Sequence, residues 1–266
     1  MVTGETVTEP IFARPSSTVI LVRDGPTGLE MFLVRRHEQS GFANLAYVFP
    51  GGATIPSDTA EASIGLSSSF TPADAFNVLH ERGDVSPDSP TECFSFWLAA
   101  ARELLEEAGV LIHDGARLPG QDEIGSARLR SLADGADFAS GVRSMGVGLG
   151  LERLIYFSHW RTPVQAPKRY DTRFFITSMP VGQAASHCNI ETTDSLWISP
   201  REALARSEAK ELLLVFPTRM NVSLLLPHES VSDVLEFARS KVIRCVDPIV
   251  SNDRLGSTDP EIIACW

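Results

Sequence analysis

The chain has 266 residues, of which 43% are hydrophobic, so it is long and apolar enough to bury a core as one elaborated domain over residues 1–266. Its net charge of −11 argues against a nucleic-acid surface, because a phosphate backbone is bound by clustered Lys and Arg. No apolar run approaches the roughly 18 residues that cross a bilayer, so we expect no membrane partner.

Both chain ends and the cysteines favour a cytoplasmic location. Residues 1–17 are polar and lack the apolar core of a secretory signal. The last three residues, 264–266, do not form a peroxisomal Ser-Lys-Leu ending. The four cysteines are widely spaced, without a paired metal-ligand pattern, and we interpret them as reduced structural thiols: Cys93, Cys188, Cys245 and Cys265.

The N-terminal part is predicted to form a β-hairpin and a third short strand. β-Branched residues are frequent at 17–23, and an apolar run at 29–36 follows the turn signal Asp-Gly-Pro-Thr-Gly at 24–28. The third apolar run covers residues 46–49.

The Pro-Gly-Gly run at 50–52 ends this strand, because proline stops it and the glycines permit a tight or left-handed backbone. Residues 53–92 then become rich in Ser, Thr, Asp, Pro and Ala, which indicates an insertion. Within it we expect a short helix over residues 72–81, capped by Thr71.

The strongest helical pattern covers residues 92–108, and Gly109 suits its C-terminal cap. A helical pair is expected between residues 122 and 145. Further strands are expected at 153–160, 173–178 and 195–198. Further helices are expected after the Ser-Pro-Arg-Glu run at 199–202 and at 218–226 and 230–241, followed by a loop-like tail at 248–266. This order predicts a single α/β domain.

Three carboxylates share one face of the predicted helix over residues 92–108. Glu103, Glu106 and Glu107 are spaced i, i+3 and i+4, within reach of one ion. Like charges this close repel unless a cation compensates them, and hard divalent cations prefer oxygen ligands. The alternative is a solvated acidic surface, which normally places Lys or Arg four residues after its glutamates; Glu107 and Val110 stand there instead. The pattern therefore predicts a metal site.

Residues 102–110, Arg-Glu-Leu-Leu-Glu-Glu-Ala-Gly-Val, resemble the second half of the Nudix box, Arg-Glu-apolar-any-Glu-Glu-any-Gly-apolar, at every specified position. Upstream, Phe49-Pro50-Gly51-Gly52 is similar to the strand end and glycine pair that open this box. The resemblance implies the Nudix fold, an α/β/α sandwich with a mixed central sheet, here with added C-terminal helices.

The two halves of the box lie far apart in this chain. The compact box has 13 residues between its glycine and its arginine, whereas 49 residues lie between Gly52 and Arg102. The glutamate expected eight residues before the arginine is replaced by Phe94, and Glu92 can substitute only with an irregular helix start. We therefore expect residues 53–92 to be an insertion within the box, outside the central sheet and near the mouth of the pocket.

An insertion within the box resembles the CoA and acyl-CoA diphosphatase branch of the family. The runs Phe-Leu-Val-Arg-Arg at 32–36, Ser-His-Trp at 158–160 and Tyr-Asp-Thr-Arg-Phe-Phe at 170–175 also fit this branch, as does Glu191. The resemblance spans roughly residues 17–226. It implies metal-dependent hydrolysis of a diphosphate linkage in a nucleotide derivative, CoA or acyl-CoA, to 3′,5′-ADP and (acyl-)phosphopantetheine.

The resemblance also implies roles for single residues. Glu103, Glu106 and Glu107 would hold Mg²⁺, or alternatively Mn²⁺, Arg102 would orient them, and Gly52 would let the backbone turn close to the metal. The general base stays open between Glu107 and Glu191. Gly51 and Gly52 belong to the expected substrate site, and the basic residues best placed to receive phosphate are Arg35, Arg36, Lys168, Arg169 and Arg173.

Two other functions remain open at this point. An ADP-ribose or other nucleoside-diphosphate pyrophosphatase would use the same fold and metal site. A non-catalytic Nudix ligand sensor is the alternative from a different class, although such a protein has no reason to keep three repelling carboxylates together. The expected partner is a small nucleotide, and the sequence leaves homodimer formation open.

Overall fold

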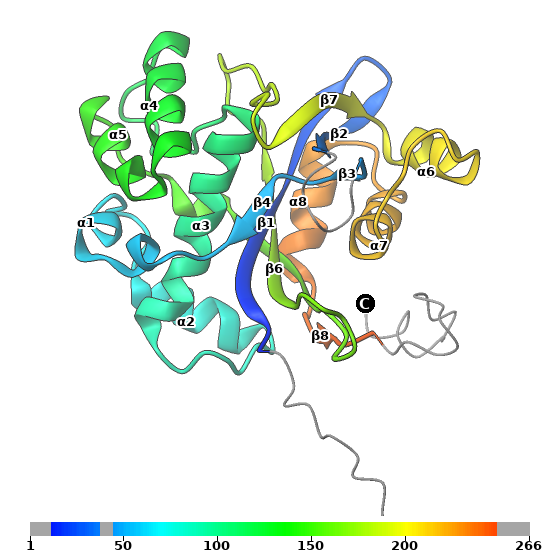
Figure 1. Cartoon of the computed structure of the whole chain (residues 1–266), viewed down its shortest axis with the longest axis horizontal. Helices are drawn as coiled ribbons and strands as arrows, with labels where there is room; N and C mark the ends of the chain where they lie inside the picture. Colours follow the sequence, from blue (N-terminus) through cyan, green and yellow to red (C-terminus); the bar gives the residue numbers. More distant parts are fainter. Residues whose placement is uncertain (1–11, 38–44, 249–266) are drawn as a thin grey trace, which may run out of the picture.

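A computed structural model describes residues 12–37 and 45–248 and shows three layers, helix, sheet and helix (Figure 1). This confirms the predicted α/β/α sandwich with a mixed sheet. The strands are β1 (Arg14–Gly25), β2 (Gly28–Arg36), β3 (Tyr47–Val48), β4 (Gly51–Ala53), β5 (Ile155–Arg161), β6 (Tyr170–Ser178), β7 (Thr192–Ile198) and β8 (Cys245–Val246). The helices are α1 (Glu61–Ile64), α2 (Pro72–Glu81), α3 (Pro90–Ala108), α4 (Gln121–Ala133), α5 (Phe138–Ser144), α6 (Pro200–Glu208), α7 (Phe216–Leu225) and α8 (Val231–Ser240). Short 3₁₀ turns are η1 (Pro56–Thr59), η2 (Gly135–Asp137) and η3 (Leu151–Arg153).

The β1–β2 hairpin opens to admit two short strands. The two strands pair with each other, antiparallel, only next to the turn, where residues 22–25 of β1 pair with residues 28–31 of β2. Beyond that pairing, β4 joins β1 and β3 joins β2, while β7 pairs with the outer side of β2. On the other side of β1, β6 runs parallel to it and is followed by β5 and β8. The open end of the hairpin is where the glycine pair lies.

Successive side chains of the strands point to opposite faces of the sheet and pack into two separate hydrophobic cores. Val19 and Leu21 of β1 face the core formed with α2, α3, α4 and α5, whereas Ile20 and Val22 face the core formed with α7 and α8. This period of two is the strand alternation expected of a sheet covered on both faces. In Figure 1, helices α1 to α5 lie on one side of the sheet and α6 to α8 on the other.

Helix α3 is the central helix of its layer, because every residue from Cys93 to Ala108 is buried. It begins at Pro90, two residues earlier than predicted, since Ser89 accepts a hydrogen bond from the Glu92 N–H as the N-cap and proline suits the first helical turn. Gly109 ends it with a left-handed φ of 66°, as predicted. The alternative of a solvated acidic helix surface is thereby excluded.

Most predicted elements are confirmed in kind, and α2 is confirmed with its predicted bounds and its Thr71 cap. Three strands, β1, β6 and β7, begin three residues earlier than predicted. The residues at 153 and 154 belong to η3 and its cap rather than to β5. Strands β4 and β8 were missed, because a Gly-Gly-Ala run and a two-residue strand carry no apolar periodicity.

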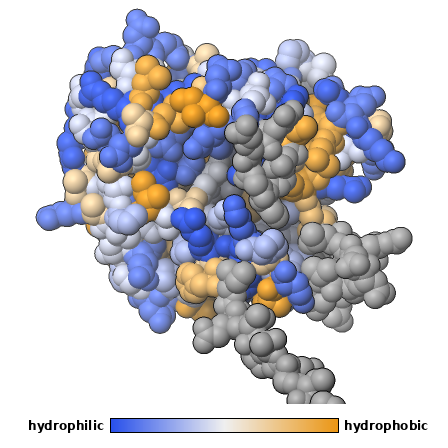
Figure 2. Space-filling model, in the orientation of Figure 1, coloured by the Kyte–Doolittle hydropathy of each residue, from blue (hydrophilic) through white to orange (hydrophobic). Residues whose placement is uncertain are grey.

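The surface shown in Figure 2 is mainly hydrophilic, and hydrophobic residues form separate patches on it. Within residues 12–37 and 45–248, none of the helices combines the length and the apolar character that a membrane crossing needs. Cys93, Cys188 and Cys245 are free, as predicted. Residues 1–11 and 249–266, including Cys265 and most of the predicted tail, lie outside the described residues.

Candidate active site

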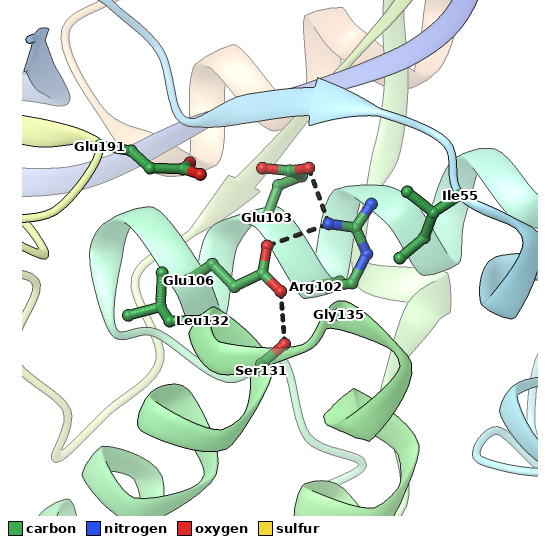
Figure 3. A pocket seen from close by; sticks show the side chains of 8 residues that line it. All are labelled: Ile55, Arg102, Glu103, Glu106, Ser131, Leu132, Gly135 and Glu191. Atoms are coloured by element: carbon green, nitrogen blue, oxygen red, sulfur yellow. Dashed lines mark hydrogen bonds and ion pairs between the residues drawn. The ribbon is translucent and has the colours of Figure 1, made fainter.

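A pocket of about 210 Å³ opens beside the C-terminal half of α3. Its walls come from the η1 turn, from α4 with the η2 turn, and from the loop that precedes β7. Figure 3 shows the acidic and basic side chains pointing toward one another across it. The lining residues are Ile55, Arg102, Glu103, Glu106, Ser131, Leu132, Gly135 and Glu191.

Arg102 is the hub of this pocket and is 3% exposed. Its Nε and Nη2 donate to the two carboxylate oxygens of Asp58, each at 3.1 Å. Its Nη1 donates to Glu103 at 2.7 Å and to Glu106 at 3.0 Å, and Nη2 also donates to the Ala53 carbonyl at 2.9 Å. All three nitrogens of the guanidinium are therefore engaged, and one cation sits among three buried carboxylates.

The glycine pair is required by space rather than by a left-handed backbone. A Cβ added to Gly52 would lie 2.3 Å from the Glu103 carboxylate, and one added to Gly51 would lie 2.4 Å from the Ser17 carbonyl. Both glycines belong to β4 and neither has a positive φ, which corrects the prediction of a tight or left-handed turn. The Gly51 N–H donates to Glu107 at 2.8 Å, so β4 lies directly against α3.

Burial and mutual repulsion act on all three helix glutamates. Burial raises the pKa of Glu103 to about 7; the Arg102 charge opposes this shift and Glu106 reinforces it. The pKa of Glu106 is also raised, mainly by burial. Burial raises the pKa of Glu107 well above its ordinary range, Glu103 adds to the shift and the Gly51 N–H opposes it. The site thus holds more negative charge than Arg102 alone neutralises.

This electrostatic strain gives a pH prediction for the metal-free protein. Because the folded-state pKa of Glu103, about 7, lies above its ordinary value of 4.5, the folded state binds more protons than the unfolded state between these pH values. The free energy of unfolding should therefore fall by roughly 1–3 kcal/mol as pH rises from about 4.5 to about 7. Urea unfolding in a chelator across this range measures it, and a Glu103→Gln variant should lack this part of the pH dependence. An identical slope in both proteins would contradict the prediction.

Glu191 and Arg36 come to the site from neighbouring strands. Glu191 lies in the loop before β7 and lines the pocket opposite Glu103 and Glu106 (Figure 3). Arg36 ends β2, pairs with Thr192 and places its positive charge where it opposes the upward shift of the Glu107 pKa. The structure thus brings both residues to the helix carboxylates.

The other predicted phosphate ligands lie elsewhere. Arg35 is directed to Tyr47 and Asp194, whose pKa values it affects. Lys168 is exposed and Arg169 lines a second pocket, of about 260 Å³, which shares no residue with the first. Both precede β6, on the side of β1 opposite to β4.

Arg173 is a buried structural arginine rather than a phosphate ligand. It is 1% exposed, and its guanidinium pairs with Asp84 at 2.9 Å and with Asp171 at 2.8 Å. The possible ligand atoms of His159, Asp171 and Cys245 lie within 4.8 Å of one another in the same region. The cation of Arg173 bound to Asp171 disfavours a metal ion there, so we interpret the group as an ion-pair network.

Two side chains that bind the charged residues of the site were not predicted from the sequence. Asp58, 2% exposed, binds Arg102 from η1, and Ser131 of α4 donates to Glu106. The signal for Asp58 was available, because it follows Gly52 by six residues, the offset of the glutamate from the glycine in the compact box. Phe94, which stands at the position expected for the box glutamate, is fully buried in the apolar core and does not line the pocket. Nothing local in the sequence marks Ser131.

Comparisons with known proteins agree with this geometry. The family model described as the NUDT19 Nudix domain matches residues 11–225. The acyl-coenzyme A diphosphatase NUDT19 of Gallus gallus is 28% identical over 253 residues, which cover 82% of this chain and 67% of the relative. The protein of the same name from Homo sapiens is 26% identical over 262 residues, covering 87% and 70%.

A solved structure supports the same fold. The crystal structure of a NUDIX hydrolase from Alicyclobacillus acidocaldarius has a TM-score of 0.65 and 26% identity, and covers 87% of this chain and 97% of its own. Since the family model spans most of the chain and includes both halves of the box, the chain belongs to the Nudix hydrolases, in the family defined by the NUDT19 Nudix domain.

Proposed function

We propose that this Nudix hydrolase cleaves the diphosphate linkage of CoA or acyl-CoA to give 3′,5′-ADP and (acyl-)phosphopantetheine. The observation that carries the hydrolytic part is the pocket itself, in which Arg102 holds Glu103 and Glu106 and Glu191 faces them. The substrate class is carried by the likeness to relatives named acyl-coenzyme A diphosphatases.

The donor set fits a divalent cation. Glu103, Glu106 and Glu107 offer hard oxygen ligands, and their pKa values are raised mainly by burial and further by neighbouring carboxylates, so a cation would stabilise their charged forms. We propose Mg²⁺, with Mn²⁺ as an alternative. Bound there, the ion would neutralise phosphoryl charge and activate water. Arg102 fixes the orientation of Glu103 and Glu106, while Ser131 holds the second oxygen of Glu106.

Glu191 is the residue that we assign as general base. Glu107 is buried and bonded to the Gly51 N–H, whereas Glu191 is exposed and lines the pocket, so it can exchange protons with solvent. Glu191 accepts the proton of the attacking water, whose oxygen bonds to one phosphorus as the bridging P–O bond breaks. The second phosphate leaves with the bond electrons.

A substrate panel tests this proposal and its alternative. We expect CoA and a short acyl-CoA to be cleaved in preference to dephospho-CoA and ADP-ribose, with 3′,5′-ADP as a product identified by chromatography. A site for the ribose 3′-phosphate requires a cation whose loss weakens only substrates that carry this group. Equal turnover of all substrates by the wild type would favour the ADP-ribose pyrophosphatase function.

The structure ranks the basic residues for this assay. The charge of Arg36 opposes the rise in the Glu107 pKa, and Arg36 pairs with Thr192, the residue after Glu191. Arg36→Ala should therefore lower kcat/KM for CoA by roughly tenfold or more, as loss of a charged phosphate contact does. Lys168→Ala is the matched control and should leave kcat/KM unchanged; Arg35→Ala and Arg169→Ala complete the set. A loss confined to the Lys168 or Arg169 variant would contradict the ranking.

We also propose that the box runs unbroken from Gly52 to Asp58 and that the insertion proper follows it. Ile55 lines the pocket and Asp58 binds Arg102. Of the predicted insertion, Ala53 belongs to β4 of the sheet, and the residues after η1 contribute α1, α2 and the first residues of α3 but no strand. We also propose a single-domain organisation, a cytoplasmic location and the formation of a homodimer.

A further inference from the structure

We propose that Arg128 is a positioning residue that fixes the general base relative to the metal-binding carboxylates. It does so by holding residues 186–191, here termed the Glu191 loop, against the C-terminal end of α3. The inference rests on the role proposed above for Glu191 and assigns to α4 a part in catalysis without direct contact with substrate.

Arg128 binds the C-terminal end of α3. The last carbonyls of a helix have no partner within it and attract positive charge. Arg128 reaches over from α4 and donates from Nε to the Glu106 carbonyl and from Nη2 to the Glu107 carbonyl, both at 3.0 Å. The fit is close, because a Cβ added to Gly109 would lie 2.9 Å from Arg128 Nη1. The guanidinium therefore holds the backbone of two carboxylate residues.

Arg128 also binds the start of the Glu191 loop. The same guanidinium donates from Nη2 to the Ser186 carbonyl at 2.7 Å and from Nη1 to the Ser186 hydroxyl at 3.3 Å. The Ser186 N–H in turn donates to the Ala108 carbonyl at 2.9 Å. The half-buried Arg128 thus joins the end of α3 to the first residue of the Glu191 loop.

Hydrogen bonds within the loop connect its start to Glu191. The Cys188 N–H donates to the Thr192 hydroxyl at 3.1 Å, and the Glu191 N–H lies 3.3 Å from the Cys188 sulfur. At its other end the Glu191 carbonyl accepts from the His37 N–H at 3.2 Å. The loop is therefore held from β2 on one side and from Arg128 on the other.

The position of Glu191 relative to the helix carboxylates determines the rate, which is why the attachment by Arg128 matters. Glu191 lines one pocket with Glu103 and Glu106 but belongs to a segment far from them in the sequence. A displacement of about 1 Å between reacting groups costs up to roughly a hundredfold in rate. Since Arg128 binds both segments, its loss should misplace Glu191 while Arg102 and Ser131 still hold their carboxylates.

A double-mutant cycle tests the inference. We would measure kcat with CoA and Mg²⁺ for Arg128→Met, Glu191→Gln and the double variant, with Arg130→Met, an exposed arginine of the same helix, as control. Arg128→Met should lower kcat roughly 10- to 100-fold. In the Glu191→Gln background the same substitution should cost no more than about twofold, because residues that act as a unit are not additive. Arg130→Met should match the wild type.

Binding of Mn²⁺ without substrate supplies a readout independent of turnover, and Arg128→Met should retain it. Additive losses in the cycle, an unchanged kcat for Arg128→Met, or loss of Mn²⁺ binding would each overturn the inference. Arg128→Lys, which keeps the charge with a single donor group, carries the cycle if the methionine variant does not fold. Full activity of Glu191→Gln would remove the base and this inference with it, whereas the proposed hydrolysis fails only if the wild type releases no 3′,5′-ADP.

Discussion

Replacing Glu106 or Glu107 by Gln should lower kcat on the order of a thousandfold and leave the protein folded. Both carboxyl groups are buried with raised pKa values, so their charged forms are costly in the metal-free protein. At position 107 the amide oxygen of Gln keeps an acceptor for the Gly51 N–H. At position 106 it keeps the acceptor for Arg102, while the amide N–H donates to the Ser131 hydroxyl, which can accept as well as donate. The free energy of unfolding in a chelator should accordingly be unchanged or higher.

The measurement combines turnover with Mn²⁺ binding and urea unfolding. Glu236→Gln, in an exposed position of α8 on the opposite face of the sheet, is the matched control and should change none of the three quantities. Loss of turnover together with loss of Mn²⁺ binding identifies the carboxylates as metal ligands. Full turnover by either variant would reject the site, and wild-type turnover without any divalent metal would reject the cofactor.

Local spacing was sufficient to predict the acidic part of the site. The three glutamates and Arg102 lie within two turns of one helix, so their relation depends only on helix geometry. The burial of that helix depends on α2, α4 and the sheet, which helical spacing does not reveal. The same holds for Ser131 and Arg128, which reach α3 from α4.

Sheet order limited the prediction of the basic residues. Arg35 and Arg36 are adjacent in the sequence, but the strand alternation and an irregularity between them direct only Arg36 toward Glu107. Lys168 and Arg169 lie within a segment that matches the family, yet β1 separates that segment from β4. Basic residues within or next to family-like segments of the sequence therefore do not all lie near the pocket.

Asp58→Asn should destabilise the protein by about 3 kcal/mol, because the amide NH₂ of Asn would face an N–H of Arg102 where a carboxylate oxygen now accepts, which breaks a buried bidentate pair. This corresponds to a fall in melting temperature of roughly 6–12 °C. The kcat should fall as well, since Arg102 orients Glu103 and Glu106 only while its own guanidinium is fixed.

The matched control separates the two ways of counting the box. Counting back from Arg102 leads to Phe94, with exposed Glu92 as the substitute, whereas counting forward from Gly52 leads to Asp58. Glu92→Gln should change the free energy of unfolding by no more than about 0.5 kcal/mol. In an Arg102→Met background, Asp58→Asn should add little further loss, because the partner that makes its charge necessary is already gone. A large effect of Glu92→Gln with none of Asp58→Asn would place the accessory carboxylate at the helix start. The expected outcome instead places the accessory carboxylate in η1, at Asp58. The long insertion of the box then follows Asp58 in the chain and does not precede it.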